Sequence, residues 1–151
     1  MNIQVDDERC GSGEYAVSLL VEMAPEKLAI EERVPGVAGK AFDLKGWYRA
    51  WKSTRTDDEA AEPSRMTVEA ADEFQADIPW DQLDQAVFLY EQDGKPIQKG
   101  YPLRLYVPDG SSECLNVKSI VRIRFFYDQS SSEATYGFKN QISVDELRLK
   151  K

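Results

Sequence analysis

Short stretches in which apolar and polar residues alternate run through much of the 151-residue chain, and turn-forming residues separate them. A period of two is typical of strands that bury one face. The alternation is clearest in residues 103–107 and 117–126, which we predict to be two strands that pair or lie side by side. Two further strands are predicted over residues 66–70 and 86–90.

Apolar residues near helical spacing predict a short helix over residues 42–51, with an aromatic face packed into the core. That face comprises Phe42, Leu44, Trp47, Tyr48 and Trp51. Residues 25–33 are expected to form one or two helical turns that begin at Pro25, and residues 78–83 a single turn. Residues 15–23 are apolar, and their length and β-branched side chains favour a strand, with a helix as the alternative.

No internal repeat or linker-like composition divides the sequence. Residues 54–64 are acidic and are expected to form an exposed loop. A serine-rich stretch over residues 129–132 is expected to end the compact part, so that residues 129–151 form a C-terminal tail element. The last segment of this tail, 142–151, is predicted to be either a strand or a short amphipathic helix. We therefore predict one α+β domain over residues 1–151, built on a mixed β-sheet.

Composition narrows the chemistry that this domain can perform. The chain has 27 acidic and 19 basic residues, a net charge of −8, and no histidine. Catalytic units that need an imidazole and His-ligated metal sites are therefore excluded. An acidic surface also argues against nucleic-acid binding, which needs a basic footprint. The acidic residues fall in runs that we interpret as solvated surface, at residues 6–8, 31–32, 57–59 and 72–73.

The polar N-terminal residues and the two cysteines bear on the compartment. Residues 1–13 have neither the basic nor the apolar stretch of a secretory signal. No apolar cluster approaches the roughly 20 residues that span a bilayer. Cys10 and Cys114 either form one disulfide or are two reduced thiols, and the second interpretation is favoured. We therefore expect a cytoplasmic protein with no membrane partner.

The charge is unevenly distributed along the chain. Residues 1–98 hold 21 acidic and 10 basic residues, whereas residues 99–128 hold five basic and three acidic ones. The basic region coincides with the best-predicted pair of strands. On the second strand, alternation places Val117, Ser119, Val121, Ile123 and Phe125 on one side and Lys118, Ile120, Arg122 and Arg124 on the other.

This pattern brings an arginine and a lysine close to the loop that joins the strands. If the strands are neighbours, Arg104 and Lys118 converge near residues 108–116, where Gly and Ser residues offer backbone N–H donors. An arginine fork, a lysine and backbone donors are the ingredients of a phosphate site. The alternative is a solvated sheet face, although Tyr106 and Ile120 on the polar side indicate that this face is partly covered.

The amino-acid sequences of three segments resemble those of a known family. Residues 100–108 (GYPLRLYVP), 117–123 (VKSIVRI) and 86–97, in which Asp93-Gly94 is a turn signal, are similar to the end of the sulfite-oxidase-type molybdopterin-binding domain. The resemblance extends over residues 78–126. It implies the fold of that domain and molybdopterin as the cofactor.

The resemblance also implies roles for individual residues. Arg104 and Lys118 match the residues that contact the phosphate and pterin of the molybdenum cofactor in this family. Lys99, Ser111 and Ser112 complete the predicted cofactor-binding set.

Two departures from the family pattern concern catalysis. Lys99 stands where family enzymes commonly have a histidine. The upstream cysteine that binds molybdenum in those enzymes is also missing, since no cysteine lies between Gly11 and Glu113. Cys114 is a candidate for a displaced metal ligand, but a small residue in a turn is the simpler interpretation.

Two functions follow from these observations. The first is a molybdopterin-type binding domain that holds an anionic, pterin-phosphate-like ligand, and it is favoured. The alternative is a non-catalytic protein-interaction domain on the same fold.

Overall fold

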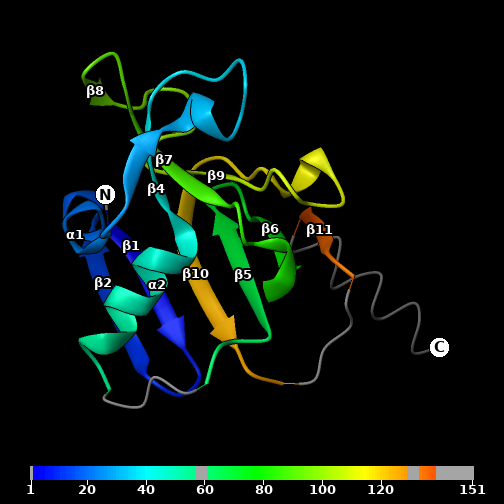
Figure 1. Cartoon of the computed structure of the whole chain (residues 1–151). Helices are drawn as coiled ribbons and strands as arrows, with labels where there is room; N and C mark the ends of the chain where they lie inside the picture. Colours follow the sequence, from blue (N-terminus) through cyan, green and yellow to red (C-terminus); the bar gives the residue numbers. More distant parts are fainter. Residues whose placement is uncertain (1, 57–60, 129–132, 139–151) are drawn as a thin grey trace.

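Two β-sheets and two helices make up most of the computed structural model, which describes residues 2–56, 61–128 and 133–138. The helices are α1 (Val17–Met23) and α2 (Leu44–Ser53), and they lie on the same side of the larger sheet (Figure 1). Neither has the length and apolar character that crossing a bilayer requires. The prediction of a small α+β domain with mixed strand directions is confirmed at this level.

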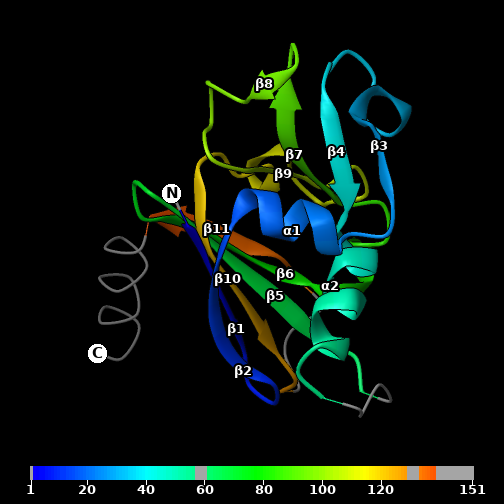
Figure 2. The ribbon, with the colours of Figure 1, turned by 90° about the vertical axis from the view of Figure 1, so that its left-hand side faces the viewer.

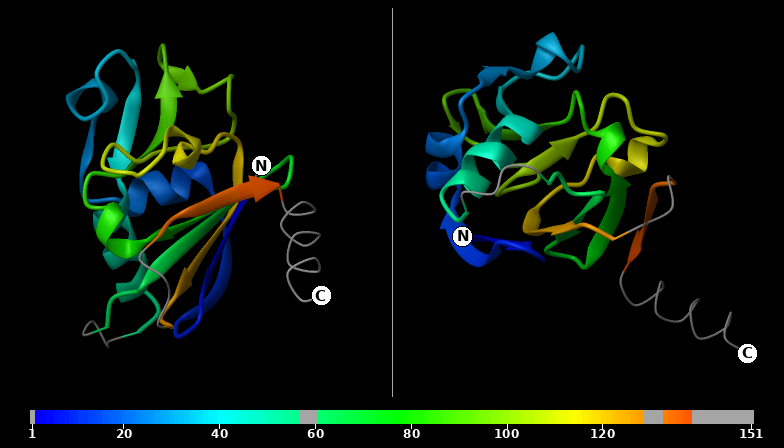
Figure 3. Two further views of the ribbon diagram at one scale, coloured as in Figure 1. Left: turned by 90° about the vertical axis from the view of Figure 1, so that its right-hand side faces the viewer. Right: turned by 60° about the horizontal axis from the view of Figure 1, so that its bottom comes forward.

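The larger sheet has the strand order β11-β6-β5-β10-β1-β2. Its strands are β1 (Asn2–Asp7), β2 (Gly11–Ala16), β5 (Arg65–Ala70), β6 (Phe74–Pro79), β10 (Ile120–Phe126) and β11 (Thr135–Phe138). Strands β1 and β10 are parallel, and the other pairs are antiparallel. Figure 3 shows β11 beyond β6 at the edge of this sheet.

The smaller sheet has the order β3-β4-β7-β8, with β9 paired to β7. Its strands are β3 (Lys27–Ala29), β4 (Lys40–Asp43), β7 (Val87–Gln92), β8 (Lys95–Pro96) and β9 (Arg104–Tyr106). Three 3-10 turns, η1 (Ile30–Glu32), η2 (Trp80–Gln82) and η3 (Glu113–Leu115), connect the strands.

Helix α2 carries the aromatic face that its sequence predicts. The Asp43 carboxylate caps its start and accepts a hydrogen bond from the Gly46 backbone N–H at 2.8 Å. Trp47, Tyr48 and Trp51 are fully buried, and the ring centroids of Tyr48 and Phe125 are 4.3 Å apart. The helix therefore joins the larger sheet to the smaller one through an aromatic core.

A second, smaller apolar cluster covers the opposite face of the smaller sheet. It contains Ile30, Ala41, Val87, Leu89, Ile97 and Tyr106. The smaller sheet is thus buried on both faces, which explains why residues 86–90 read as a nearly continuous apolar run.

Two predicted elements are wrong in type. In residues 15–23 the strand ends at Ala16, and residues from Val17 onward form α1, which is the helical alternative. In residues 25–33 the chain forms β3 and only the 3-10 turn η1. The two errors have different causes. Pairing of β2 with β1 ends at Ala16, which lies opposite Asn2 at the start of β1, so the residues from Val17 onward have no partner in β1 and form a helix. Pairing with β4 makes residues 27–29 a strand despite the helical start signal at Pro25.

The other predicted strands are confirmed. Strand β5 (Arg65–Ala70) covers the predicted residues 66–70, and β7 (Val87–Gln92) covers all but the first of the predicted residues 86–90. The turn η2 (Trp80–Gln82) supplies the single turn expected over residues 78–83. Asp93 and Gly94 have φ values of 54° and 73° and turn β7 into β8.

The serine-rich stretch does not end the sheet, because β11 follows it and pairs with β6. Residues 57–60 of the predicted loop and the segment 142–151 lie outside the described residues, and residues 54–56 and 61–64 contain no helix or strand.

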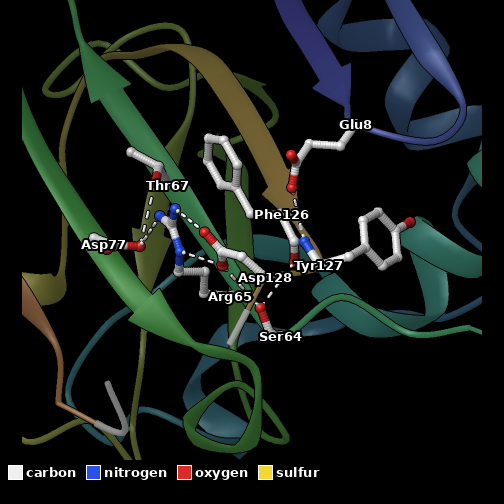
Figure 4. Close-up of polar contacts among 8 residues, drawn as sticks. All are labelled: Glu8, Ser64, Arg65, Thr67, Asp77, Phe126, Tyr127 and Asp128. Atoms are coloured by element: carbon white, nitrogen blue, oxygen red, sulfur yellow. Dashed lines mark hydrogen bonds and ion pairs between the residues drawn. The ribbon is translucent and has the colours of Figure 1, made fainter. Parts of the chain in front are cut away.

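The end of β10 is held by a cluster of polar contacts (Figure 4). The guanidinium of Arg65 donates to both carboxylate oxygens of Asp128, at 3.1 and 3.0 Å, and to Asp77 at 2.9 Å. Its central carbon lies 4.1 Å from the centroid of the Phe126 ring. These contacts join β5, β6 and the segment after β10. The hydrogen bond from Arg65 lowers the pKa of Asp128.

Candidate functional site: a basic cluster between the two sheets

The two best-predicted strands lie side by side but belong to different sheets. Strand β9 pairs with β7, whereas β10 lies between β5 and β1. Around the start of β10, the backbones of the two segments are joined by two hydrogen bonds. The Leu105 N–H donates to the Val117 carbonyl (2.8 Å), and the Ile120 N–H donates to the Leu103 carbonyl (2.9 Å). Arg104 therefore lies opposite residues 118 and 119.

A bulge interrupts the alternation of faces predicted for residues 117–126. Ser119 has φ 56°, and the pairing of β10 with β5 changes register between Ile120 and Arg122. Ile120 is consequently buried with Ile123 in the core, so its predicted place beside Arg122 is wrong. Arg122 instead pairs with Asp6, with 2.8 Å between Nε and Oδ2.

Three cationic residues are brought together at this junction, and we call Lys99, Arg104 and Lys118 the basic cluster. The Ser119 N–H donates to the Gly100 carbonyl at 3.0 Å. Because Lys118 precedes Ser119 and Lys99 precedes Gly100, the two lysines lie on adjoining segments. The stem of Arg104 packs on Gly100, where an added Cβ would lie 2.5 Å from its Cδ.

The charge of the basic cluster is not neutralised within the part of the chain that the structure describes. None of its three residues forms an ion pair there, whereas Arg33, Arg65 and Arg122 each pair with a carboxylate. Lys99 and Lys118 are exposed, and Arg104 is half-buried. Tyr106, on the same side of β9 as Arg104, is buried by the second apolar cluster, in agreement with a partly covered face. A concentration of unpaired positive charge attracts an anion.

The loop over residues 108–116 uses several of its polar groups internally. The Ser111 N–H donates to Gln82 Oε1 at 3.3 Å, and Ser112 Oγ accepts from the Cys114 N–H at 3.1 Å to cap η3. Roles in anion binding for Ser111 and Ser112 remain predictions, with less support in the geometry than those of the basic cluster.

Neither cysteine is an upstream thiolate that lies beside the basic cluster. Both thiols are free. Cys10 follows β1, which runs parallel to β10, so it lies beyond the end of β10 while Lys118 precedes its start. A seven-residue strand is roughly 20 Å long. Cys114 is exposed in η3. Among the described residues, no group of three His, Cys, Asp or Glu side chains is arranged to hold a metal ion.

One acidic residue that was expected to be solvated is buried instead. Asp7 is 4% exposed, and its carboxylate accepts hydrogen bonds from the hydroxyls of Tyr48 and Tyr127, both at 2.6 Å. It also accepts from the backbone N–H groups of Arg9 and Cys10 at 2.8 and 3.0 Å. Burial acts to raise the pKa of Asp7, but these hydrogen bonds outweigh it and the pKa is lowered.

A pocket of about 400 Å³ adjoins the turn that carries the basic cluster. Its walls are mainly apolar and come from α1, from the end of β7 and from Tyr101–Pro102. We call it the tyrosine pocket, because Tyr90 and Tyr101 both line it. The sequence alone could not indicate it, since its walls come from segments that only the tertiary structure brings together.

The described chain is thus a small mixed α+β domain with a basic cluster at the junction of its two sheets. A family model for the oxidoreductase molybdopterin binding domain matches residues 51–134, which is more than half of the chain. The chain belongs to this family, and the resemblance seen in its sequence is confirmed. A search of curated proteins found no match.

The residues present fit one part of molybdopterin and not another. Its phosphate is an anion, and the basic cluster offers three cations without a carboxylate partner among the described residues. Cys10 supplies no thiolate beside Arg104, because it lies beyond the opposite end of β10, and Cys114 is exposed in η3. The fit is therefore to the organic, anionic end of the cofactor.

Proposed function

We propose that this domain binds the phosphate end of molybdopterin, or of a closely related pterin phosphate, at the basic cluster. Arg104 supplies a planar fork of donors, and Lys99 and Lys118 supply point charges on adjoining segments. The observation that carries the proposal is that Arg104 has a fixed stem, packed on Gly100, and no carboxylate partner in the described ranges.

The same proposal includes a sulfite-oxidase-type fold and a binding role without a cysteine ligand to molybdenum. The absence of cysteine between Gly11 and Glu113, together with the position of Cys10, supports this role. Its chemistry is to hold and orient an anionic ligand. A protein-interaction domain on the same fold remains the alternative.

Purification from a host that makes the cofactor tests the proposal. We expect stoichiometric pterin, measured by its fluorescence after oxidation, and its loss in Arg104→Ala and Lys118→Ala. Arg49→Ala is the matched control, because Arg49 lies on the exposed side of α2 and pairs with Glu62. Complete absence of pterin from the wild-type protein would overturn the proposal and favour the protein-interaction alternative. Molybdenum content, measured on the same samples, reports whether metal accompanies the pterin.

A further inference from the structure

A polar hollow lies on the face of the larger sheet that α1 and α2 do not cover. Figure 2 shows both helices on one side of β1 and β10, and side chains that point to the other side line the hollow. Its volume of about 340 Å³ is at the lower end of the range for small-molecule sites. Asp7 and Phe125 also border it, but their side chains are buried in the core. We call it the outer hollow, and its other polar side chains are those of Gln4, Asp6, Glu8, Ser12, Arg122 and Arg124.

Two charged groups of the outer hollow neutralise each other. The Nε of Arg122 donates to Oδ2 of Asp6 at 2.8 Å, and the Asp6 side chain is only 16% exposed. The side-chain amide of Gln4 donates to the other oxygen of the same carboxylate at 3.2 Å. This pair therefore contributes no net charge to the hollow.

Arg124 has no such partner. It stands opposite Asp6 in the register of β1 and β10, but that carboxylate is held by Arg122. In the described ranges no ion pair joins Arg124 to a carboxylate, and its Nε is buried without a hydrogen-bond partner. The described protein thus leaves this guanidinium unsatisfied, which is costly for a partly buried cation. A carboxylate fits it best, because it can accept two parallel hydrogen bonds from the planar fork.

Glu8 brings a negative charge to the same hollow. One of its oxygens accepts a hydrogen bond from the Tyr127 backbone N–H at 2.9 Å (Figure 4). A carboxylate has about four lone-pair sites, so acceptor capacity remains. Because Glu8 follows Asp6 by two residues, strand spacing and rise place its Cα roughly 8 Å from that of Arg124. A small ligand can bridge two side chains at this separation.

A cation without a partner and a nearby carboxylate define the ligand by its charges. A simple anion would be repelled by Glu8, and a simple cation by Arg124. A ligand that carries a carboxylate close to an ammonium group satisfies both residues, and an α-amino acid has these two groups on one carbon atom. Phe126 is half-buried and adds an apolar wall, which favours an apolar side chain on the ligand.

We propose that the outer hollow binds an α-amino acid with an apolar side chain. Arg124 holds its carboxylate, Glu8 accepts from its ammonium group, and Phe126 contacts its side chain. No residue of the basic cluster lines the outer hollow. The inference is therefore independent of the proposed function.

Three related ligands test the charge pattern on the wild-type protein. L-Phenylalanine carries both charges, 3-phenylpropanoate only the carboxylate, and phenethylamine only the ammonium group. Titrations followed by the backbone amide signals in two-dimensional NMR give the affinity and the place of binding. We expect L-phenylalanine to shift the signals of residues 4–12 and 122–126. Phenethylamine should bind at least about tenfold more weakly, and 3-phenylpropanoate about threefold more weakly, because Glu8 is exposed.

Two variants assign the charges to residues. Arg124→Gln should weaken binding of L-phenylalanine about tenfold without weakening that of phenethylamine. Glu8→Gln keeps an acceptor for the Tyr127 N–H and should make L-phenylalanine and 3-phenylpropanoate bind equally. Arg9→Gln is the matched control, because Arg9 is a neighbouring exposed arginine that packs on the Tyr127 ring and does not line the hollow. Dispersed amide signals report that each variant is folded, and the wild-type ligand series decides if one is not.

Each contrary outcome overturns a stated part of the inference. Absence of shifts around the outer hollow overturns it, and so does equal affinity for the three ligands, which would indicate apolar contact alone. Shifts confined to residues 99–118 place the ligand at the basic cluster and overturn it as well. Equal weakening by Arg124→Gln and Arg9→Gln overturns the role of Arg124. Binding of L-phenylalanine here without any binding of pterin contradicts the proposed function alone.

Discussion

The guanidinium carbon of Arg104 lies 5.1 Å from the centroid of the Tyr106 ring, two residues further along β9. The ring is buried in the second apolar cluster, so it fixes the arginine without neutralising its charge. Arg65 offers the contrast, since two carboxylates hold it. An arginine held by an aromatic ring and by glycine backbone keeps its donors for a ligand.

Gly100→Ala is expected to destabilise the fold and to weaken anion binding. Gly100 has φ +84°, which costs an L-residue about 1–2 kcal/mol, and the added methyl group would displace the stem of Arg104. Gly94→Ala is the control, because Gly94 has φ +73° and open space around it. Chemical unfolding and pyrophosphate titration should show a similar loss of stability in both variants and weaker binding only in Gly100→Ala. Equal binding by both would contradict the positioning of Arg104 by Gly100.

Ser119→Gly is expected to stabilise the protein by up to about 1 kcal/mol, because Ser119 has φ 56° and glycine relieves the left-handed strain. Ser119→Val should destabilise it, since a β-branched residue tolerates this conformation poorly. Urea unfolding measures both changes. If Ser119→Val proves neutral, the bulge at the start of β10 does not depend on this backbone conformation.

Asp7→Asn is expected to lower the free energy of unfolding at neutral pH by about 1–3 kcal/mol, because a charged acceptor of four hydrogen bonds is lost. The folded pKa of Asp7 is lowered, so its contribution is fully present above the unfolded value of about 3.9 and is lost as the pH falls through the folded value.

The pH dependence provides the check. Unfolding of wild-type and Asp7→Asn proteins, measured from pH 7 to pH 2, should show a constant difference above about pH 4 that narrows below it. Tyr48→Phe and Tyr127→Phe each remove one donor and should show smaller differences of the same sign. A difference that grows as the pH falls would contradict the lowered pKa.

The two thiols are expected to react at different rates with a thiol reagent under native conditions. Cys114 is exposed and should react first. Cys10 is half-buried, and burial, followed by the neighbouring Asp7 carboxylate, raises its pKa, which reduces the reactive thiolate. Cys114→Ser should remove the fast phase. Failure to titrate two thiols in the wild-type protein would indicate a disulfide and contradict the free cysteines.

Local sequence was sufficient for elements whose pattern and environment agree. Helix α2 was predictable because its aromatic residues fall on one face and Asp43 caps its start. Strand β7 and its turn were predictable because an apolar run meets Asp93-Gly94. Strand β3 was not, since its three residues form a strand only by pairing with β4.

The candidate site was predictable in part. The residue types and spacing of Arg104 and Lys118 indicated an anion-binding site, and the resemblance to the family's sequence motifs indicated molybdopterin. The tyrosine pocket gave no such signal, because Met23 at the end of α1 and Val87 at the start of β7 are 64 positions apart in sequence. Asp7 was misread as solvated, since its tyrosine partners lie 41 and 120 positions away.

By itself, the sequence determined that the chain has no histidine, no cysteine between Gly11 and Glu113, and a local excess of positive charge. It also carries the sequence motifs of its family. The tertiary structure alone decided which positive charges stay unpaired among the described residues. Arg122 meets Asp6 across a parallel pair of strands, whereas Arg104 meets an aromatic ring. The physical reason is that charge neutralisation depends on distance in space, and residues 116 positions apart become neighbours only when the sheets form.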